Sequence, residues 1–307
     1  MKVTVIGAGN VGATCANVLA LKEIATEVVL LDVAEGVAEG KAMDISQSMV
    51  ASGFDTIVTG VTNDYTKTAN SEVVVVTSGM PRKPGMSREE LVSVNVSIVE
   101  SVVKNTLAYS PNAIFVIVTN PLDTMALVAL KVSGLPKNRV IGMGGALDSS
   151  RFAYFLSKKL NKPINEVQAM VIGGHGDTTM IPLTNYASYK GVAINNLLSK
   201  DEISEIVAET MVGGATLTKL LGTSAWYAPG AAAANVVDSI LGDKKKLIPS
   251  SVYLEGEYGT EDLCIGVPCI IGRNGVEEIV NLNLSISELE LFNKSVTAIK
   301  EVNQLLN

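Results

Sequence analysis

The 307-residue chain is poor in cysteine and histidine and contains no long apolar run. Its three cysteines, Cys15, Cys264 and Cys269, are an odd number at a spacing that fits no metal motif, so we expect buried free thiols in a reducing compartment. It contains one histidine and one tryptophan, and no apolar run approaches the roughly 20 residues that a membrane helix needs. We therefore expect no metal site and no membrane as a partner.

Positive charge is also in deficit, because 24 Lys and Arg residues face 31 Asp and Glu residues. The net charge of −7 argues against nucleic acid as a partner, although a local arginine cluster can still bind a small anion. Residues 1–6 enter a strand pattern without the charged leader and apolar segment of an export signal, so we expect a cytoplasmic protein. Hydrophobic residues make up 47%, which excludes disorder and favours a large core together with a subunit interface.

The first half alternates short Val- and Ile-rich runs with segments of helical period. This pattern is typical of a doubly wound parallel sheet with both faces covered, in which ligands bind beyond the carboxyl ends of the strands. Helices are expected at 11–21, 41–50, 88–109 and 125–132. The expected strands are 3–6, 27–31, 56–59, 72–77, 113–119 and 140–143.

The pattern changes near residue 145 to a mixture of helices and antiparallel strands. We expect a capping box of Ser199 and Glu202, and a second cap of Ser287 and Glu290 on the last helix. Other expected elements are helices at 147–160 and 231–241, a strand at 167–172 and antiparallel strands within 246–284. The sequence therefore predicts an α/β protein whose first domain, residues 1–145, precedes an α+β substrate domain, residues 146–307.

A glycine fingerprint follows the first expected strand and opens a helix. The first glycine permits a tight turn, the second lets the backbone approach a pyrophosphate, and the third lets the helix pack closely on the strand. Asp32 ends the second strand, 20 residues after Gly12, where a carboxylate can accept both ribose hydroxyls and repels a 2′-phosphate. This predicts a Rossmann domain that binds NAD rather than NADP, with its fingerprint at Gly7, Ala8, Gly9, Asn10, Val11 and Gly12.

Two further motifs follow strands at the same edge of the sheet. A loop at 79–88 carries Arg82 and Arg88, which can turn inward when the loop closes. The fifth strand ends in Val118-Thr119-Asn120-Pro121, where Asn120 can donate to a substrate oxygen. Its bond to Pro121 can be cis or trans, and the residues leave this open. Taken alone, the motifs also fit a solvated basic loop and an ordinary turn.

The remaining candidates for chemistry lie in the second half. Asp148 and Arg151 are three residues apart near an expected helix start, so both can point to one face, although a plain ion pair has the same spacing. His175, the single histidine, lies in Gly173-Gly174-His175-Gly176-Asp177 at a strand end. A general base near neutral pH is most readily a histidine, so His175 is the candidate acid/base.

Taken together and in this order, the motifs resemble the lactate/malate dehydrogenase family over nearly the whole chain. The resemblance implies hydride transfer with NAD, His175 as general acid/base and Asp148 as its orienting partner. It further implies that Arg151 holds the carboxylate beside the reacting carbon and that Arg88 polarises the carbonyl. The other implied site residues are Asn120 at the substrate oxygen, Asn95, Val118, Thr119 and Asn120 beside the cofactor, and Ser224 or Ala225 at the pocket.

The residue that sets the substrate is Arg82. Family members that act on malate carry Arg at this loop position, and those that act on lactate typically carry Gln. Arg clamps the second carboxylate of oxaloacetate with two parallel hydrogen bonds, whereas pyruvate would leave it unpaired. The resemblance thus implies reversible oxidation of (S)-malate to oxaloacetate, a reaction of the tricarboxylic acid cycle, by a homo-oligomer, with a tetramer favoured over a dimer. The alternatives are lactate or another 2-hydroxy acid as substrate, an NAD sensor without turnover, and a subunit whose main role is assembly.

Overall fold

A mixed sheet runs through both halves of the chain. The computed structural model describes residues 1–81 and 87–306, except for the side chain of Arg88. Its parallel part has the order β3-β2-β1-β4-β5-β6. The six expected strands are confirmed, with ends that shift by at most three residues. Their bounds are β1 (Lys2–Ile6), β2 (Glu27–Asp32), β3 (Ile57–Thr62), β4 (Val73–Val76), β5 (Ile114–Ile117) and β6 (Val140–Gly142).

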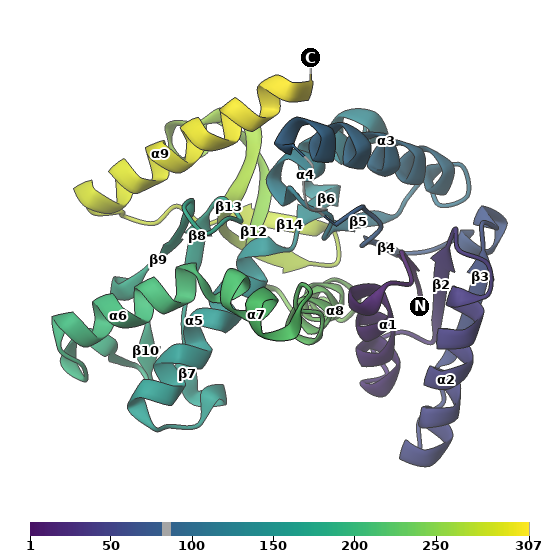
Figure 1. The fold of residues 1–307 in the computed structure, drawn as a ribbon, viewed down its shortest axis with the longest axis horizontal. Coiled ribbons are helices and arrows are strands. Elements are labelled where there is room, and N and C mark those ends of the chain that lie inside the picture. The colour runs from purple at the N-terminus through teal and green to yellow at the C-terminus, as the bar shows by residue number, and fades with distance from the viewer. Residues whose placement is uncertain (82–86, 307) are drawn as a thin grey trace.

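Helices cover both faces of this parallel part, as a doubly wound sheet requires. Alternate side chains of β4 point to opposite cores: Val73 and Val75 pack with α1 (Asn10–Leu21) and α2 (Val37–Ser52), and Val74 and Val76 with α3 (Arg88–Leu107) and α4 (Leu122–Ser133). Figure 1 shows α1 and α2 apart from α3 and α4. A strand buried on both faces must be apolar throughout, which is why β4 consists of four valines.

Helix α2 begins at Val37, four residues before the expected start at residue 41. The first turn is held by packing rather than by local sequence: Ala38 is fully buried, and a Cβ on Gly60 of β3 would collide with its carbonyl. Helix α4 likewise begins three residues earlier than expected, directly after Pro121.

The sheet continues into the C-terminal half as antiparallel strands in the order β6-β12-β13-β8-β9. The expected strand at 167–172 is wrong as a single element, because its first two residues pair with β10 in a separate small sheet and its last two pair with β9 in the large sheet. The antiparallel strands expected within 246–284 are confirmed as β12 (Lys246–Glu255), β13 (Glu261–Gly272) and β14 (Gly275–Ile279). The short strands are β7 (Val167–Gln168), β8 (Val171–Gly173), β9 (Met180–Pro182), β10 (Ser188–Tyr189) and β11 (Val192–Ala193).

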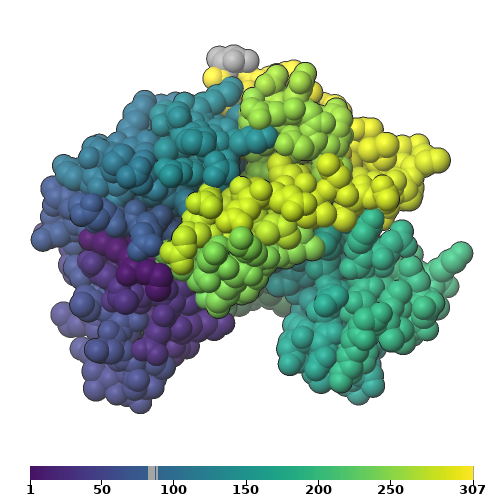
Figure 2. Space-filling view, turned by 180° about the vertical axis from the view of Figure 1, so that it is seen from behind, coloured from purple at the N-terminus to yellow at the C-terminus, as the bar shows by residue number. Residues whose placement is uncertain are grey.

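Five further helices are described in this half. The cap expected at Ser287 and Glu290 is wrong: Ser285 and Glu288 form the capping box, the first of two overlapping Ser-x-x-Glu patterns. The cap at Ser199 and Glu202 is confirmed. From behind, the yellow C-terminal chain lies between the purple and blue N-terminal residues and the teal middle segment (Figure 2). The bounds are α5 (Gly144–Leu160), α6 (Lys200–Met211), α7 (Gly213–Leu221), which was not expected, α8 (Tyr227–Leu241) and α9 (Ile286–Asn303).

The cysteines are free and buried, as expected. Burial raises the pKa of the Cys15 thiol to about 12 and also raises those of Cys264 and Cys269, so these thiols are unreactive near neutral pH. None of the helices in the described ranges is long and apolar enough to cross a membrane.

Candidate active site

A cavity of about 320 Å³ lies where β4, β5 and β6 end, bordered by α5, α7 and the loop after β8. Ligands of doubly wound sheets bind at this carboxyl edge, so the position agrees with the expectation from the fold. Segments from both halves of the chain meet here. The cavity is lined by nine of the residues singled out in the sequence: Val11, Asn95, Val118, Thr119, Asn120, Arg151, His175, Ser224 and Ala225.

Asp148 connects the histidine to an arginine. Its Oδ2 atom lies 2.7 Å from Nδ1 of His175, and its Oδ1 accepts a hydrogen bond of 3.0 Å from Nη1 of Arg151. The Asp148 side chain is 2% exposed, whereas His175 is 16% exposed and lines the cavity. Burial works to lower the pKa of His175, but the carboxylates of Asp148 and, to a smaller extent, Asp123 together outweigh it and the pKa is raised. The pair therefore favours an imidazolium that can donate a proton into the cavity.

The backbone around His175 depends on glycines at two positions. Gly173 ends β8 with φ +85°, a left-handed conformation that side chains disfavour. Gly144, the first residue of α5, lies directly against the histidine, where a Cβ would come within 2.7 Å of the His175 Cβ. Gly144 was missed in the sequence. The only signal for it is the pair Gly144-Gly145 directly after the sixth strand.

The position of the Arg151 side chain depends on the backbone of Gly213, which lies close to it. Its side chain is 11% exposed and passes over Gly213, the first residue of α7, where a Cβ would collide with the arginine Cδ. The sequence offered no signal for this contact, because α7 itself was not expected. Gly213 therefore leaves room for the observed conformation, in which Arg151 bonds Asp148 and lines the cavity.

The variant Gly213→Ala is expected to lower kcat/KM by about 10²-fold, because the added methyl displaces the Arg151 side chain and small misplacements of a binding group have effects of this size. Steady-state kinetics of the two proteins measure it. Gly40→Ala is the control, since it also replaces a helical glycine by alanine, but a Cβ on this glycine of α2 meets nothing within 4 Å. Equal activity of both variants would contradict the role of Gly213.

Asn95 and Thr119 line the cavity, but their polar side-chain atoms form hydrogen bonds with backbone groups. Asn95 Oδ1 accepts from the Met80 amide at 2.7 Å, and its Nδ2 donates to the carbonyl of Asn120 at 2.7 Å. Thr119 Oγ1 donates to the carbonyl of Ser78 at 2.6 Å. These side chains thus tie the segment after β4 to the segment after β5. The Asn120–Pro121 peptide bond at this junction is cis.

The glycine fingerprint has the geometry that its residue types require. Gly7 has φ +103°, and a Cβ on Gly12 would collide with the Gly7 carbonyl, so helix α1 approaches the strand as closely as the pattern predicts. A Cβ on Gly9 would meet nothing within 4 Å, so the backbone there faces open space. The Asp32 carboxylate accepts from the Ala8 amide and, at 2.9 Å, from the Ala34 amide.

Two of the expected arginines fall outside this description. Arg82 lies among residues 82–86, which the structure does not describe, and the side chain of Arg88 is not described either. Helix α3 begins at Arg88 behind a capping box of Ser87 and Glu90. Within the described residues, no group of three or more His, Cys, Asp and Glu side chains is placed to hold a metal ion.

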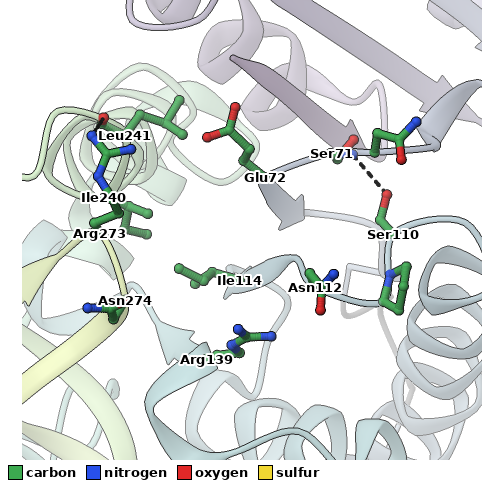
Figure 3. Close-up of a pocket in the computed structure, with 12 residues that line it drawn as sticks. Ser71, Glu72, Ser110, Asn112, Ile114, Arg139, Ile240, Leu241, Arg273 and Asn274 are labelled. Atoms are coloured by element: carbon green, nitrogen blue, oxygen red, sulfur yellow. Dashed lines mark hydrogen bonds between the residues drawn. The ribbon is translucent and has the colours of Figure 1, made fainter.

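A second cavity, of about 370 Å³, lies at the opposite edge, before β4 and β5 begin. Figure 3 shows Glu72, Arg139 and Arg273 around it, with the hydrogen bond between Ser71 and Ser110 at one side. None of the candidate site residues lines it. The predicted chemistry is therefore concentrated at the carboxyl edge.

Comparison with protein families gives two matches that together span nearly the whole chain. Residues 1–142 match the lactate/malate dehydrogenase, NAD binding domain, and residues 145–305 match the lactate/malate dehydrogenase, alpha/beta C-terminal domain. The malate dehydrogenase of Parabacteroides distasonis is 67% identical over 99% of this chain and 97% of its own. That of Flavobacterium johnsoniae is 65% identical over 100% of this chain and 98% of its own.

Solved structures give the same grouping. The malate dehydrogenase of Salinibacter ruber superposes with a TM-score of 0.95 at 44% identity, covering 100% of this chain and 97% of that one. A lactate dehydrogenase of Cryptosporidium parvum with lactic acid and nicotinamide adenine dinucleotide superposes with a TM-score of 0.94 at 40% identity, covering 99% and 97%. The fold is thus common to proteins named for either substrate, so the backbone does not distinguish the two substrates.

Proposed function

The chain belongs to the lactate/malate dehydrogenase family, and from this we propose that it catalyses the reversible oxidation of (S)-malate to oxaloacetate with NAD. The observation that carries the proposal is the chain of contacts from Arg151 through Asp148 to His175, at a cavity that the glycine-fingerprint residue Val11 also lines. In our proposal, His175 is the proton donor and Arg151 the carboxylate binder, and both lie at the cavity where the dinucleotide binds.

A nicotinamide cofactor follows from the family, and the residues present fit one. The open space at Gly9 and the free N-terminus of α1 suit a pyrophosphate. We propose NAD rather than NADP, because Asp32 would place a carboxylate where a 2′-phosphate must lie. The fingerprint residues together with Asn95, Val118, Thr119 and Asn120 are proposed to contact the cofactor, which when bound accepts or supplies the hydride. Asn95 and Thr119 would contact the cofactor mainly through the shape that they give to the wall of the cavity, because their polar atoms bond the backbone.

The protein side chains supply the proton and the orientation. His175 takes the proton of the malate hydroxyl, or returns it to the oxaloacetate carbonyl oxygen. Asp148 holds the Nδ1 side of the imidazole, which leaves Nε2 as the atom that exchanges the proton. Because one carboxylate oxygen also binds Arg151, the acid/base and the substrate binder keep a constant spacing.

The substrate is held by arginines on two sides. Arg151 is proposed to bind the carboxylate beside the reacting carbon, with Asn120 near the substrate oxygen. Arg88 is proposed to polarise the carbonyl, and Arg82 to bind the second carboxylate. The last two roles come from sequence order within the family.

The proposal is tested by following NADH oxidation in parallel with oxaloacetate and pyruvate, and by repeating the oxaloacetate reaction with NADPH. We expect oxaloacetate with NADH to react fastest, and pyruvate at least about 10²-fold more slowly, the rate cost of one buried unpaired guanidinium. Faster turnover of pyruvate would make lactate the substrate. Equal rates with NADPH would contradict the role of Asp32. NADH binding without any turnover would favour a sensor.

The proposal also covers the assembly, the location and the division of the chain. We propose that the protein is cytoplasmic and forms a homo-oligomer, with a tetramer favoured over a dimer. Assembly is supported by large apolar side chains that are exposed in the single chain: on α2, Met43 is 63% exposed and Val50 is 86% exposed. We also propose that residues 1–145 bind the cofactor and residues 146–307 the substrate. The family match that changes between residues 142 and 145 supports this division.

A further inference from the structure

A second buried carboxylate, Asp123, lies behind the histidine. It belongs to α4, three residues after Asn120, and is 7% exposed. Its Oδ2 accepts a 2.8 Å hydrogen bond from the backbone amide of His175, and its Oδ1 accepts a 2.7 Å hydrogen bond from Oγ of Ser251 on β12. Asp123 therefore joins the cofactor-binding half to the histidine and to the antiparallel strands.

The contacts of Asp123 favour its charged form. Each carboxylate oxygen receives a donor, and the amide that faces Oδ2 has no lone pair to accept a proton in return. The pKa of Asp123 is raised by burial and by the Asp148 carboxylate, and the hydrogen bonds of Ser251 and His175 together with the His175 charge reduce this rise. A buried carboxylate with two donors can stay ionised beside an imidazolium, because the two charges stabilise each other.

The charges around the histidine come from two helices. Asp148 and Asp123 favour the imidazolium, and Arg151 opposes it. Strand β13 adds the buried Cys264 thiol near Asp123. Arg151 already shares the charge of Asp148 through its hydrogen bond, so one carboxylate serves two cations. A second negative charge restores the balance.

We propose that Asp123 is a positioning residue that anchors the backbone of His175 and, through its negative charge, extends the pH range in which the imidazole is protonated. This inference rests on the acid/base role proposed for His175. Asp148 orients the ring from one side, and Asp123 holds the main chain from another. The predicted consequence is a histidine that remains a proton donor for oxaloacetate reduction at a higher pH than one carboxylate alone would allow.

The neighbouring residue of the same loop offers an uncharged anchor for comparison. The amide of Gly174 donates a 2.8 Å hydrogen bond to Oγ of Ser295 on α9, which is 2% exposed. Adjacent amides are thus held by one charged and one neutral acceptor. Removing the neutral acceptor disturbs the loop without changing the charge near the ring.

The test replaces Asp123 by asparagine, which has nearly the same shape. The Asn oxygen can still accept from the His175 amide, and its NH2 group can donate to Ser251, whose hydroxyl reverses. Because His175 is the only histidine, an NMR titration of protein labelled with ¹³C-histidine reports its pKa directly, whether or not the enzyme turns over. Ser295→Ala is the matched control, and NADH binding checks that both variants fold.

In Asp123→Asn we expect the pKa of His175 to fall by about one unit, the size of effect that a nearby opposite charge has. Reduction of oxaloacetate needs the protonated imidazole, so its falling limb should move to lower pH. Oxidation of malate needs the neutral imidazole, so its rising limb should move in the same direction. Ser295→Ala should lower the rates without moving either limb. An unchanged His175 titration in Asp123→Asn, or an equal shift in Ser295→Ala, would overturn the proposal. If the titration shifts while the wild type turns over neither substrate, the proposed function fails, and with it the role in proton transfer, while the effect of the Asp123 charge on the His175 titration is still demonstrated.

Discussion

Replacing His175 by asparagine is expected to lower kcat for oxaloacetate reduction by roughly 10²- to 10⁴-fold, the usual contribution of a positioned general acid. The amide keeps a polar group at the same place but cannot supply a proton to the alkoxide that forms. No other histidine exists in the chain to take over. Stopped-flow or steady-state measurement of NADH oxidation gives the rate.

NADH affinity provides the control for this variant, because the cofactor cradle at Gly7–Gly12 does not depend on the imidazole. Binding measured by NADH fluorescence should stay within about twofold of the wild type. Asp148→Asn should show a comparable loss of kcat, since an amide in its place stabilises the wrong tautomer and no longer favours the imidazolium. More than a tenth of wild-type kcat in His175→Asn would remove the histidine from the proposed mechanism.

The second large effect is expected for Arg82→Gln. In our proposal Arg82 pairs with the second carboxylate of oxaloacetate, and breaking such a buried pair costs about 3–5 kcal/mol, a factor of several hundred or more in kcat/KM. The same change removes the unpaired guanidinium that would oppose pyruvate, so activity with pyruvate should rise. The ratio of the two kcat/KM values measures both effects together.

Lys83→Gln is the matched control for Arg82→Gln, because it removes the same charge from the adjacent position. Lys83 cannot form the two parallel hydrogen bonds of a guanidinium fork, so the substrate ratio should change little. Both residues lie outside the described part of the chain, and the prediction rests on the family pattern and on carboxylate chemistry. A ratio that stays constant in Arg82→Gln, or moves equally in Lys83→Gln, would show that Arg82 does not set the substrate.

Local patterns predicted the elements of the parallel sheet well. The strands are apolar because both faces of the sheet are buried. The glycines at positions 7, 9 and 12 predict the turn that follows β1. Predictions failed where packing overrides local preference. Helix α7 begins at Gly213, a residue that disfavours helix, and the cap of α9 uses Ser285 although Ser287 offers the same pattern.

The candidate site was likewise predicted only in part from the sequence. His175 could be named as a candidate in advance because it is the single histidine and lies at an expected strand end between glycines. Asp148 and Arg151 were assigned through the resemblance to the family, because a plain ion pair has the same spacing. The residue that anchors the backbone of His175 could not be named. Asp123 reads as an ordinary residue in the first turn of a helix, and only the structure shows that its carboxylate receives the amide of His175 from 52 residues away.

The resemblance to the family supplied the roles of the arginines, whereas the residues alone predicted a nucleotide-binding fold and a candidate acid/base histidine. Residue type and local spacing carry that information, because turns, strand periods and functional groups are properties of short segments. What required the folded chain is the spacing between segments. The contacts of Asp123 with Ser251, of Gly144 with His175 and of Gly213 with Arg151 arise from packing of distant elements, and no local pattern encodes which elements will meet.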